Sequence, residues 1–223
     1  MSHPSTMSRE LTLAEPQIVH DLRTFVGRAR AAQDGAVRLQ AVGGVLAAYV
    51  CILGPRILGE NLPTVLGLRT MPLREPAQLD TTVALASVSD RLARMGDDDV
   101  VLPVPPVTVT EIWAGVLPPR AGWEQQGTVS SDALLTAASD GIREIAEAVP
   151  QSPGAIVVNN ARGVVWARPI EQAPAELPAG AAFGAFALGF LVPGKQAAVF
   201  TNGRWTRLTT DTGHVLVRRA AVL

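Results

Sequence analysis

Apolar and polar side chains first alternate with the period of an α-helix. Between Pro16 and Asp34, apolar residues recur at three- and four-residue intervals, while Asp21 and Arg23 fall on the opposite side. This spacing predicts an amphipathic helix that begins near Pro16 and ends near Asp34 and Gly35. Its apolar stripe, which needs a sheet or another helix to cover it, consists of Ile18, Val19, Leu22, Phe25, Val26 and Ala29.

The pattern after this helix changes to runs that favour β-strands. Residues 36–42 and 45–53 are separated by Gly43 and Gly44, a pair that tolerates the positive φ of a tight turn, so we expect a β-hairpin. Residues 64–73 and 81–86 predict further strands. The first half of the chain therefore predicts a small antiparallel sheet with helices.

Helical periodicity returns after Pro119. It predicts three helices, over residues 130–149, 154–166 and 179–191, and two β runs then close the chain. Three helices followed by a β-hairpin is the order of a winged helix. The predicted buried stripe of the first of these helices is Leu134, Leu135, Ala138, Ile142, Ile145, Ala146 and Val149.

The predicted fold class is therefore α+β. A small antiparallel sheet with flanking helices is followed by a three-helix segment closed by a β-hairpin, in winged-helix-like order. We expect a flexible tail over residues 1–15, an α+β N-terminal half over 16–119 and a C-terminal half over 120–223. The two halves form separate domains or one integrated domain.

Composition indicates a folded protein. Of the 223 residues 48% are hydrophobic and 17% are charged, and the mean hydropathy is +0.23. A net charge of −1 provides no general attraction to nucleic acid or anionic membrane. Cys51 has no second cysteine to pair with, no secretion signal opens the chain, and the apolar stretch 179–192 is shorter than the roughly 20 residues needed to span a membrane. We expect a cytoplasmic protein without membrane association.

Candidate catalytic residues are scarce. The chain has three His and one Cys, and none has a partner at a spacing typical of a catalytic or metal site. Ser130 and Ser131 precede a helix, where capping explains them, and Glu144 and Glu147 lie on the polar side of that helix. We therefore predict no catalytic residue, no cofactor and no metal, and the sequence disfavours an enzyme.

The tryptophans suggest an interaction surface. Trp113 and Trp123 flank a proline-rich connection and Trp205 follows a hairpin tip, so partial exposure is expected, and exposed Trp beside Arg is typical of interfaces. The favoured interpretation is a non-enzymatic protein-binding or regulatory module whose partner is another protein or a second copy. The alternative is that each tryptophan packs within its own domain. The possible interface residues are Trp113, Trp123, Arg204, Trp205, Arg207, Arg218 and Arg219.

Two other functions stay open. The first is a winged-helix-like DNA-binding protein that uses its C-terminal hairpin, because residues 154–223 carry seven basic and three acidic side chains. Against it, the helix at 179–191 has no charged or amide side chain to read bases. The second is a small-molecule binder or enzyme with a site between the two halves.

Several segments of the second half carry a family resemblance. It spans mainly residues 120–220, and the chain there resembles a group of conserved hypothetical proteins from actinobacteria. The resemblance implies a cytoplasmic actinobacterial protein, and it implies no activity or ligand. The segments are Gly141–Ala146, Val165–Pro169, Ala185–Leu191, Gly203–Leu208 and Gly213–Arg219.

Overall fold

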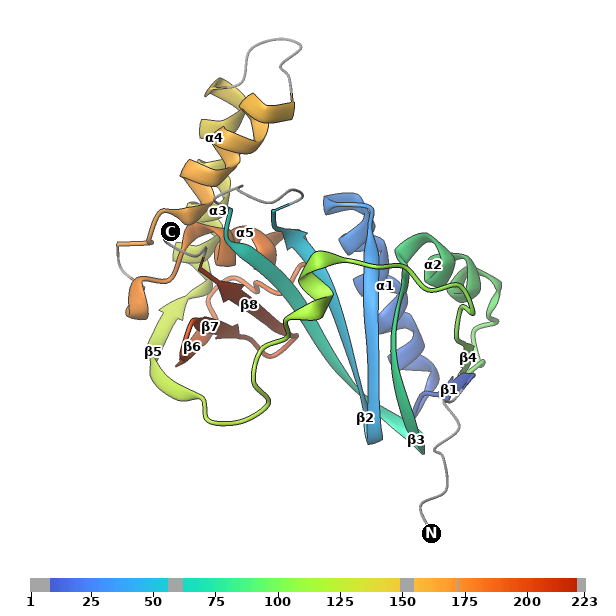
Figure 1. Ribbon diagram of the computed structural model, residues 1–223. Coiled ribbons are helices and arrows are strands. Elements are labelled where there is room, and N and C mark those ends of the chain that lie inside the picture. Colours follow the sequence, from blue (N-terminus) through green and yellow to red (C-terminus); the bar gives the residue numbers. More distant parts are fainter. Residues whose placement is uncertain (1–8, 56–61, 149–154, 172, 220–223) are drawn as a thin grey trace. The chain divides into compact units, whose positions relative to one another are not determined.

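The computed structural model describes residues 9–55, 62–148, 155–171 and 173–219 (Figure 1). The chain divides into two compact units. Unit 1 comprises Met1–Cys51 and Leu68–Gly115, and unit 2 comprises Ile52–Gly67 and Val116–Leu223. The long strands β2 (Ala36–Leu53) and β3 (Thr64–Ala84) contribute residues to both units.

Unit 1 is built around helix α1 (Pro16–Ala32), which confirms the first predicted helix. Its buried residues are those predicted, except for Ile18, which is only half-buried. Helix α2 (Leu85–Arg94) packs against α1. The side chain of Arg23 in α1 donates to the carbonyl oxygens of Leu92 and Met95, at 2.8 and 3.3 Å, and so helps to cap the end of α2.

Strand β2 contains the predicted hairpin turn. Its ribbon turns back on itself near its middle (Figure 1), where Gly43 has a φ of 58°. The start of β2 is tied to the end of β3, because the amide of Leu85 donates to the carbonyl of Gly35. Buried Val37 and Leu39 alternate with the polar side chains of Arg38 and Gln40, as expected for a strand with one covered face.

The predicted tail over residues 1–15 is wrong for its last part. Strand β1 (Glu10–Thr12) pairs antiparallel with β4 (Val101–Pro103) in a two-stranded sheet. Leu11 and Leu13 are fully buried, and their spacing of two places both on one face of the strand. Burial of these leucines orders this segment. The strand is too short for the sequence pattern to predict it.

Unit 2 consists of a sheet and the helices that pack with it. The six-stranded sheet has the order β2-β3-β8-β7-β6-β5, and residues 52–53 and 64–67 are the parts of β2 and β3 that belong to unit 2. Strands β5 to β8 pair antiparallel with their neighbours. The elements of this unit are β5 (Glu124–Ser130), α3 (Ser131–Ala148), α4 (Ala155–Ala167), η2 (Pro174–Glu176), α5 (Ala179–Ala187), β6 (Gln196–Asn202), β7 (Trp205–Thr209) and β8 (His214–Arg218).

Helix α5 lies close to the sheet because two of its residues are glycines. A Cβ atom on Gly184 would lie 2.9 Å from Val65 and 3.2 Å from Val215, and one on Gly180 would lie 3.1 Å from Val65. Val65 and Val215 belong to β3 and β8, so the two glycines let the helix approach the sheet. Helix α5 carries no charged side chain, and Ala181, Ala182 and Ala185 are buried in it.

The winged-helix-like order is wrong. Residues 124–130 form β5, a strand that pairs with β6, so the C-terminal strands extend a six-stranded antiparallel sheet instead of forming an isolated wing. The strand was missed because its sequence, Glu-Gln-Gln-Gly-Thr-Val-Ser, lacks apolar alternation and contains a glycine at an irregular register. Within the described ranges, no helix is long and apolar enough to cross a membrane.

Candidate protein-binding surface

Three side chains of unit 2 form a compact cluster that we call the Arg207 cluster: Trp123, Phe200 and Arg207. The guanidinium carbon of Arg207 lies 4.6 Å from the centroid of the Trp123 ring and 4.5 Å from that of Phe200. Phe200 and Arg207 are direct cross-strand partners in β6 and β7, which places them on the same face of the sheet. All three side chains are partly exposed, so the cluster is accessible to a partner.

This face is the one directed away from α5. Val215 of β8 lies against Gly184 of α5, so its neighbour Leu216 faces the opposite side, because successive strand residues alternate. Leu216 pairs with Arg207 across β7 and β8. The Arg207 cluster and the helices α3 and α5 therefore lie on opposite sides of the unit 2 sheet.

Burial between the rings affects the chemistry of Arg207. It lowers the pKa of the guanidinium, because desolvation disfavours the charged form. Its Nε atom is buried and has no hydrogen-bond partner within the part of the chain that the structure describes. The two aromatic faces supply cation–π attraction, which is worth about 0.5–2 kcal/mol depending on exposure.

Hydrogen bonds hold Trp123 in position. Its indole Nε1 donates to the carbonyl of Pro119 at 3.0 Å. The side-chain amide of Asn202, at the end of β6, donates to the carbonyls of Ala121 and Gly122, both at 2.8 Å. The segment before β5 is thus fastened to the sheet, and the tryptophan is placed over Arg207 before any partner arrives.

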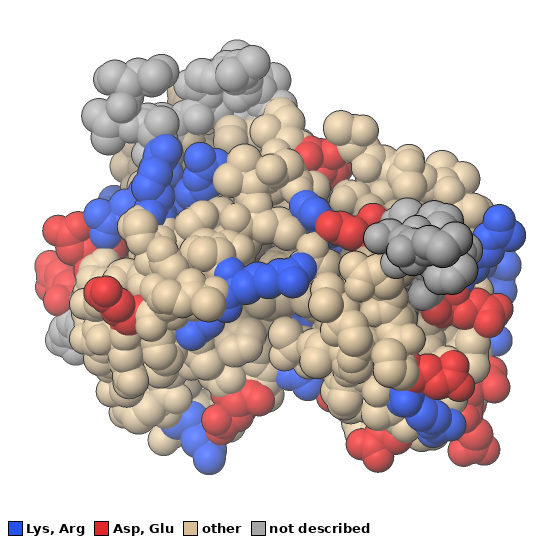
Figure 2. All heavy atoms as spheres, turned by 60° about the horizontal axis from the view of Figure 1, so that its bottom comes forward, with Lys and Arg blue, Asp and Glu red and all other residues tan. Residues whose placement is uncertain are grey.

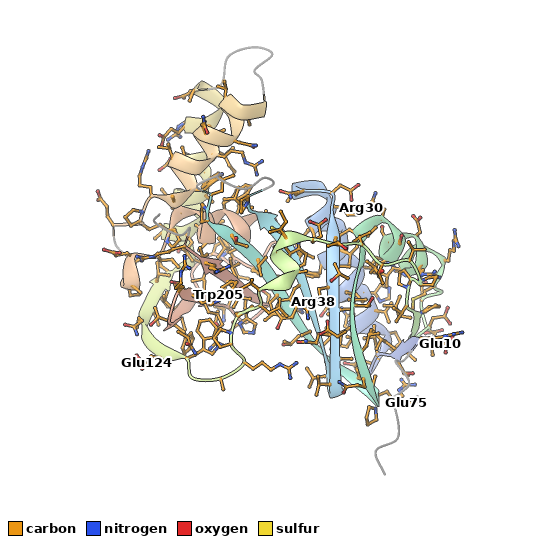
Figure 3. The ribbon with its side chains drawn as sticks, viewed as in Figure 1. Glu10, Arg30, Arg38, Glu75, Glu124 and Trp205 are labelled. Carbon is orange, nitrogen blue, oxygen red and sulfur yellow. The ribbon has the colours of Figure 1, made fainter. Side chains whose placement is uncertain are left out.

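The expected exposure of Trp205 is wrong. Its side chain is 7% exposed, and its cross-strand partners are Asn202 and Arg218. Figure 3 labels it on β7, among the side chains of the surrounding strands. Trp205 therefore has a structural role, as does Trp166, which is 1% exposed.

The arginines predicted to form one interface make different contacts in the structure. Arg219 donates to the carboxylate of Glu176 at 3.0 Å and to the carbonyls of Ala175 and Glu176. Ala175 and Glu176 have φ of 56° and 48°, values that are unfavourable for residues other than glycine. Arg219 therefore stabilises a strained turn. Arg204 is exposed and donates to the carbonyl of Arg219, and Arg218 lies half-buried opposite Trp205.

Trp113 lies in unit 1, in the short helix η1 (Ile112–Gly115), and the structure does not bring it into the Arg207 cluster. Arg38 of β2, which Figure 3 labels, anchors η1 by donating to the carbonyl of Ala114. The same guanidinium makes two 2.7 Å hydrogen bonds to Asp80, which raise its pKa. Trp113 is half-buried on this anchored segment.

A groove on the helical side of unit 2 is a feature that the sequence did not reveal. It has a volume of about 440 Å³ and lies between α3 and the chain from Val165 to Glu171. Glu144 and Arg168, 24 residues apart, form a two-point ion pair at its wall with both distances at 2.9 Å. Hydrogen bonding lowers the pKa of Glu144 and raises that of Arg168.

The other candidates for chemistry are metal-ligating side chains and histidines. Among the residues described, no group of three or more His, Cys, Asp or Glu side chains could hold a metal ion. His20 contacts the carbonyl of Pro16 within its own helix, and His214 contacts Thr209, its cross-strand partner. Figure 2 shows basic and acidic side chains interspersed over the face that it displays, with wide areas that carry neither.

Comparison with protein families divides the chain near the same point as the compact units. The model of a domain of unknown function, DUF8010, matches residues 6–115, and that of a second, DUF8185, matches residues 118–222. Two domains of unknown function cover the chain. Their boundary coincides with the change from unit 1 to unit 2 at Gly115 and Val116. No curated protein matches the sequence.

Solved structures share the fold at low sequence identity. The DNA polymerase sliding clamp of Caulobacter crescentus matches 97% of this chain with a TM-score of 0.53 and 11% identity. The sliding clamp of Bartonella birtlesii matches 96% with a TM-score of 0.53 and 9% identity. The DNA polymerase III subunit beta of Pseudomonas aeruginosa matches 96% with a TM-score of 0.51 and 11% identity.

These matches show that the chain has a sliding-clamp fold, which overturns the winged-helix prediction. The chain covers 66% of the length of the Caulobacter clamp and 65% of each of the other two. It therefore spans somewhat less than two thirds of the clamps that it resembles.

Proposed function

We propose that this chain is a cytoplasmic, non-enzymatic protein-binding module that contacts its partner through the Arg207 cluster. The observation that carries the proposal is the cluster itself, in which two aromatic rings and a partly desolvated arginine share one sheet face. Trp and Arg are the side chains most enriched among residues that dominate binding energy. Because hydrogen bonds already fix Trp123, little side-chain entropy is lost on binding.

The fold comparison supports a protein partner. Two of the clamps that share the fold are named as subunits of a DNA polymerase, and a subunit acts together with other proteins. A second copy of the chain is also a protein partner in this sense. The possible interface residues that we retain are Trp123 and Arg207, with Phe200 added, and Arg218, which lies two residues after Leu216 on β8 and so shares the face of Arg207. Arg204, which donates to the carbonyl of Arg219, is not retained.

Direct DNA binding has less support. Helix α3 carries four acidic side chains and one basic side chain, so it would repel phosphate. Two of the four arginines near the C-terminal strands are already engaged, Arg207 between aromatic rings and Arg219 with Glu176. We therefore propose no nucleic-acid function.

The test is affinity purification of the tagged chain from nuclease-treated native lysate, with and without Arg207→Ala. We expect a stoichiometric protein partner to be recovered with the unaltered chain. Arg207→Ala should weaken that complex by about 2 kcal/mol, or roughly thirtyfold, as for a residue that dominates an interface. Trp123→Ala should have a similar effect.

Arg204→Ala is the matched control, because Arg204 is an exposed arginine of the same unit that lies outside the cluster. It should leave recovery unchanged, and thermal unfolding should show that each variant remains folded. Equal recovery with Arg204→Ala and Arg207→Ala, or recovery of nuclease-sensitive material alone, would refute the proposal.

A further inference from the structure

The groove on the helical side of unit 2 has the dimensions of a peptide site. Its α3 wall extends from Ala133 to Glu144, which corresponds to about 16 Å at 1.5 Å per residue. That length accommodates about five residues of extended chain. The groove volume, about 440 Å³, lies within the range of ligand-binding sites. An extended segment of about five residues is the occupant that we consider.

Part of the groove lining is apolar. Ala133, Ala137 and Gly141 follow one another at four-residue intervals on α3, so they lie in a row along one face of the helix. Val165 and Ile170 line the opposite wall. The small side chains of Ala133 and Ala137 let the backbone of a bound segment approach the helix, whereas Trp166 covers Gly141.

The charges of the groove favour a basic occupant. Three carboxylates line it, those of Asp140, Glu144 and Glu171, against one guanidinium, that of Arg168. Arg168 is already neutralised by its two hydrogen bonds to Glu144. Asp140 also contacts Arg143, at 2.6 Å, but both side chains are exposed and such a pair is weak. Asp140 and Glu171 therefore leave a negative field for a cationic side chain.

We propose that this groove binds an extended segment of a partner protein that carries Lys or Arg between small apolar residues. The apolar floor would receive the uncharged side chains, while Asp140 and Glu171 would accept hydrogen bonds from the basic one. The groove and the Arg207 cluster lie on opposite sides of the unit 2 sheet, so this inference does not depend on the function proposed for the cluster.

The experiment is selection of a phage-displayed random heptapeptide library on the full-length protein, followed by fluorescence polarisation with the selected peptides. We expect enrichment of peptides that combine Lys or Arg with apolar residues, and affinities that fall with salt. The double variant Asp140→Lys with Glu171→Lys should weaken these peptides at least tenfold. Ala137→Trp, which fills the groove, should do the same.

Two variants serve as controls. Glu147→Lys makes, on α3 outside the groove lining, the same charge change as each single substitution of the double variant, and Arg207→Ala removes the proposed interface on the other face. Neither variant should alter peptide affinity. Loss of peptide binding in the groove is therefore distinguishable from loss of partner binding at the Arg207 cluster. The inference is overturned if no peptide is selected, if the selected peptides lack basic residues, or if none depends on Asp140, Glu171 or Ala137.

Discussion

Gly141 in α3 is closely surrounded by other side chains, whereas Gly27 in α1 is not. Substitution by alanine should therefore change the free energy of unfolding in opposite directions at the two positions. A Cβ atom on Gly141 would overlap the Trp166 ring, which is stacked against Phe183 at a centroid distance of 4.5 Å. Because that ring cannot move away freely, Gly141→Ala should destabilise the protein by about 2 kcal/mol through overpacking.

The matched substitution is Gly27→Ala in α1. A Cβ atom on Gly27 would meet no described atom within 4 Å beyond its own stretch of helix, so the variant should gain about 1 kcal/mol from better helix propensity. Urea unfolding of both variants would measure the two changes. A stabilising Gly141→Ala would show that Trp166 is not packed as described.

At the scale of elements, one ion pair joins α3 to the chain that follows α4. Arg168 lowers the pKa of Glu144 from its ordinary 4.5, so the unfolded chain takes up this proton at higher pH than the folded chain. The pair therefore contributes to stability above the ordinary pKa, and its contribution is lost as the pH falls through the lowered value.

Carbon-13 NMR titration of the Glu144 carboxyl group measures this shift directly. In the unaltered protein its midpoint should lie below 4.5, and in Arg168→Met it should return toward 4.5. Because the side chains are exposed, we expect the titration to change more than the melting temperature. Identical midpoints in the two proteins would contradict the assigned cause.

The turn at η2 is a second element with a testable energetic cost. Ala175 has a φ of 56°, a conformation that costs a non-glycine residue about 1–2 kcal/mol. Ala175→Gly should therefore stabilise the protein by about 1 kcal/mol, as measured by thermal unfolding. Ala173→Gly, at a φ of −99°, has no strain to relieve and should destabilise it instead.

Long periodic elements were predictable from the sequence, whereas short or polar ones were not. The spacing in α1 predicts the helix and nearly all of its buried face. In α3 the predicted stripe holds at Leu134 and Ala138, but Ile142 is 38% exposed, and Gly141 is buried because Trp166 packs on it. Val149 lies outside the described residues. Because glycine has no side chain, the pattern of apolar residues cannot predict that a tryptophan packs against it.

At the scale of the whole molecule, the Arg207 cluster was only partly predictable, because it joins residues that are far apart in the sequence. Composition pointed to Trp123 and Arg207, but only strand pairing shows that Phe200 completes their cluster. The expected exposure of Trp205 failed because its neighbours in the sheet cover it. Arg168 and Glu144 meet because α3 and α4 pack side by side, as Figure 1 shows.

The most direct test of the central claim is photo-crosslinking in living cells with p-benzoylphenylalanine in place of Gln125. Gln125 is exposed and is the cross-strand partner of Phe200, so the probe lies beside the Arg207 cluster without altering it. The control position is Asp98, an exposed residue of unit 1. Our account predicts a discrete protein adduct from position 125 that is lost with Arg207→Ala and is absent from position 98. No adduct at position 125, or one that persists with Arg207→Ala, would contradict it.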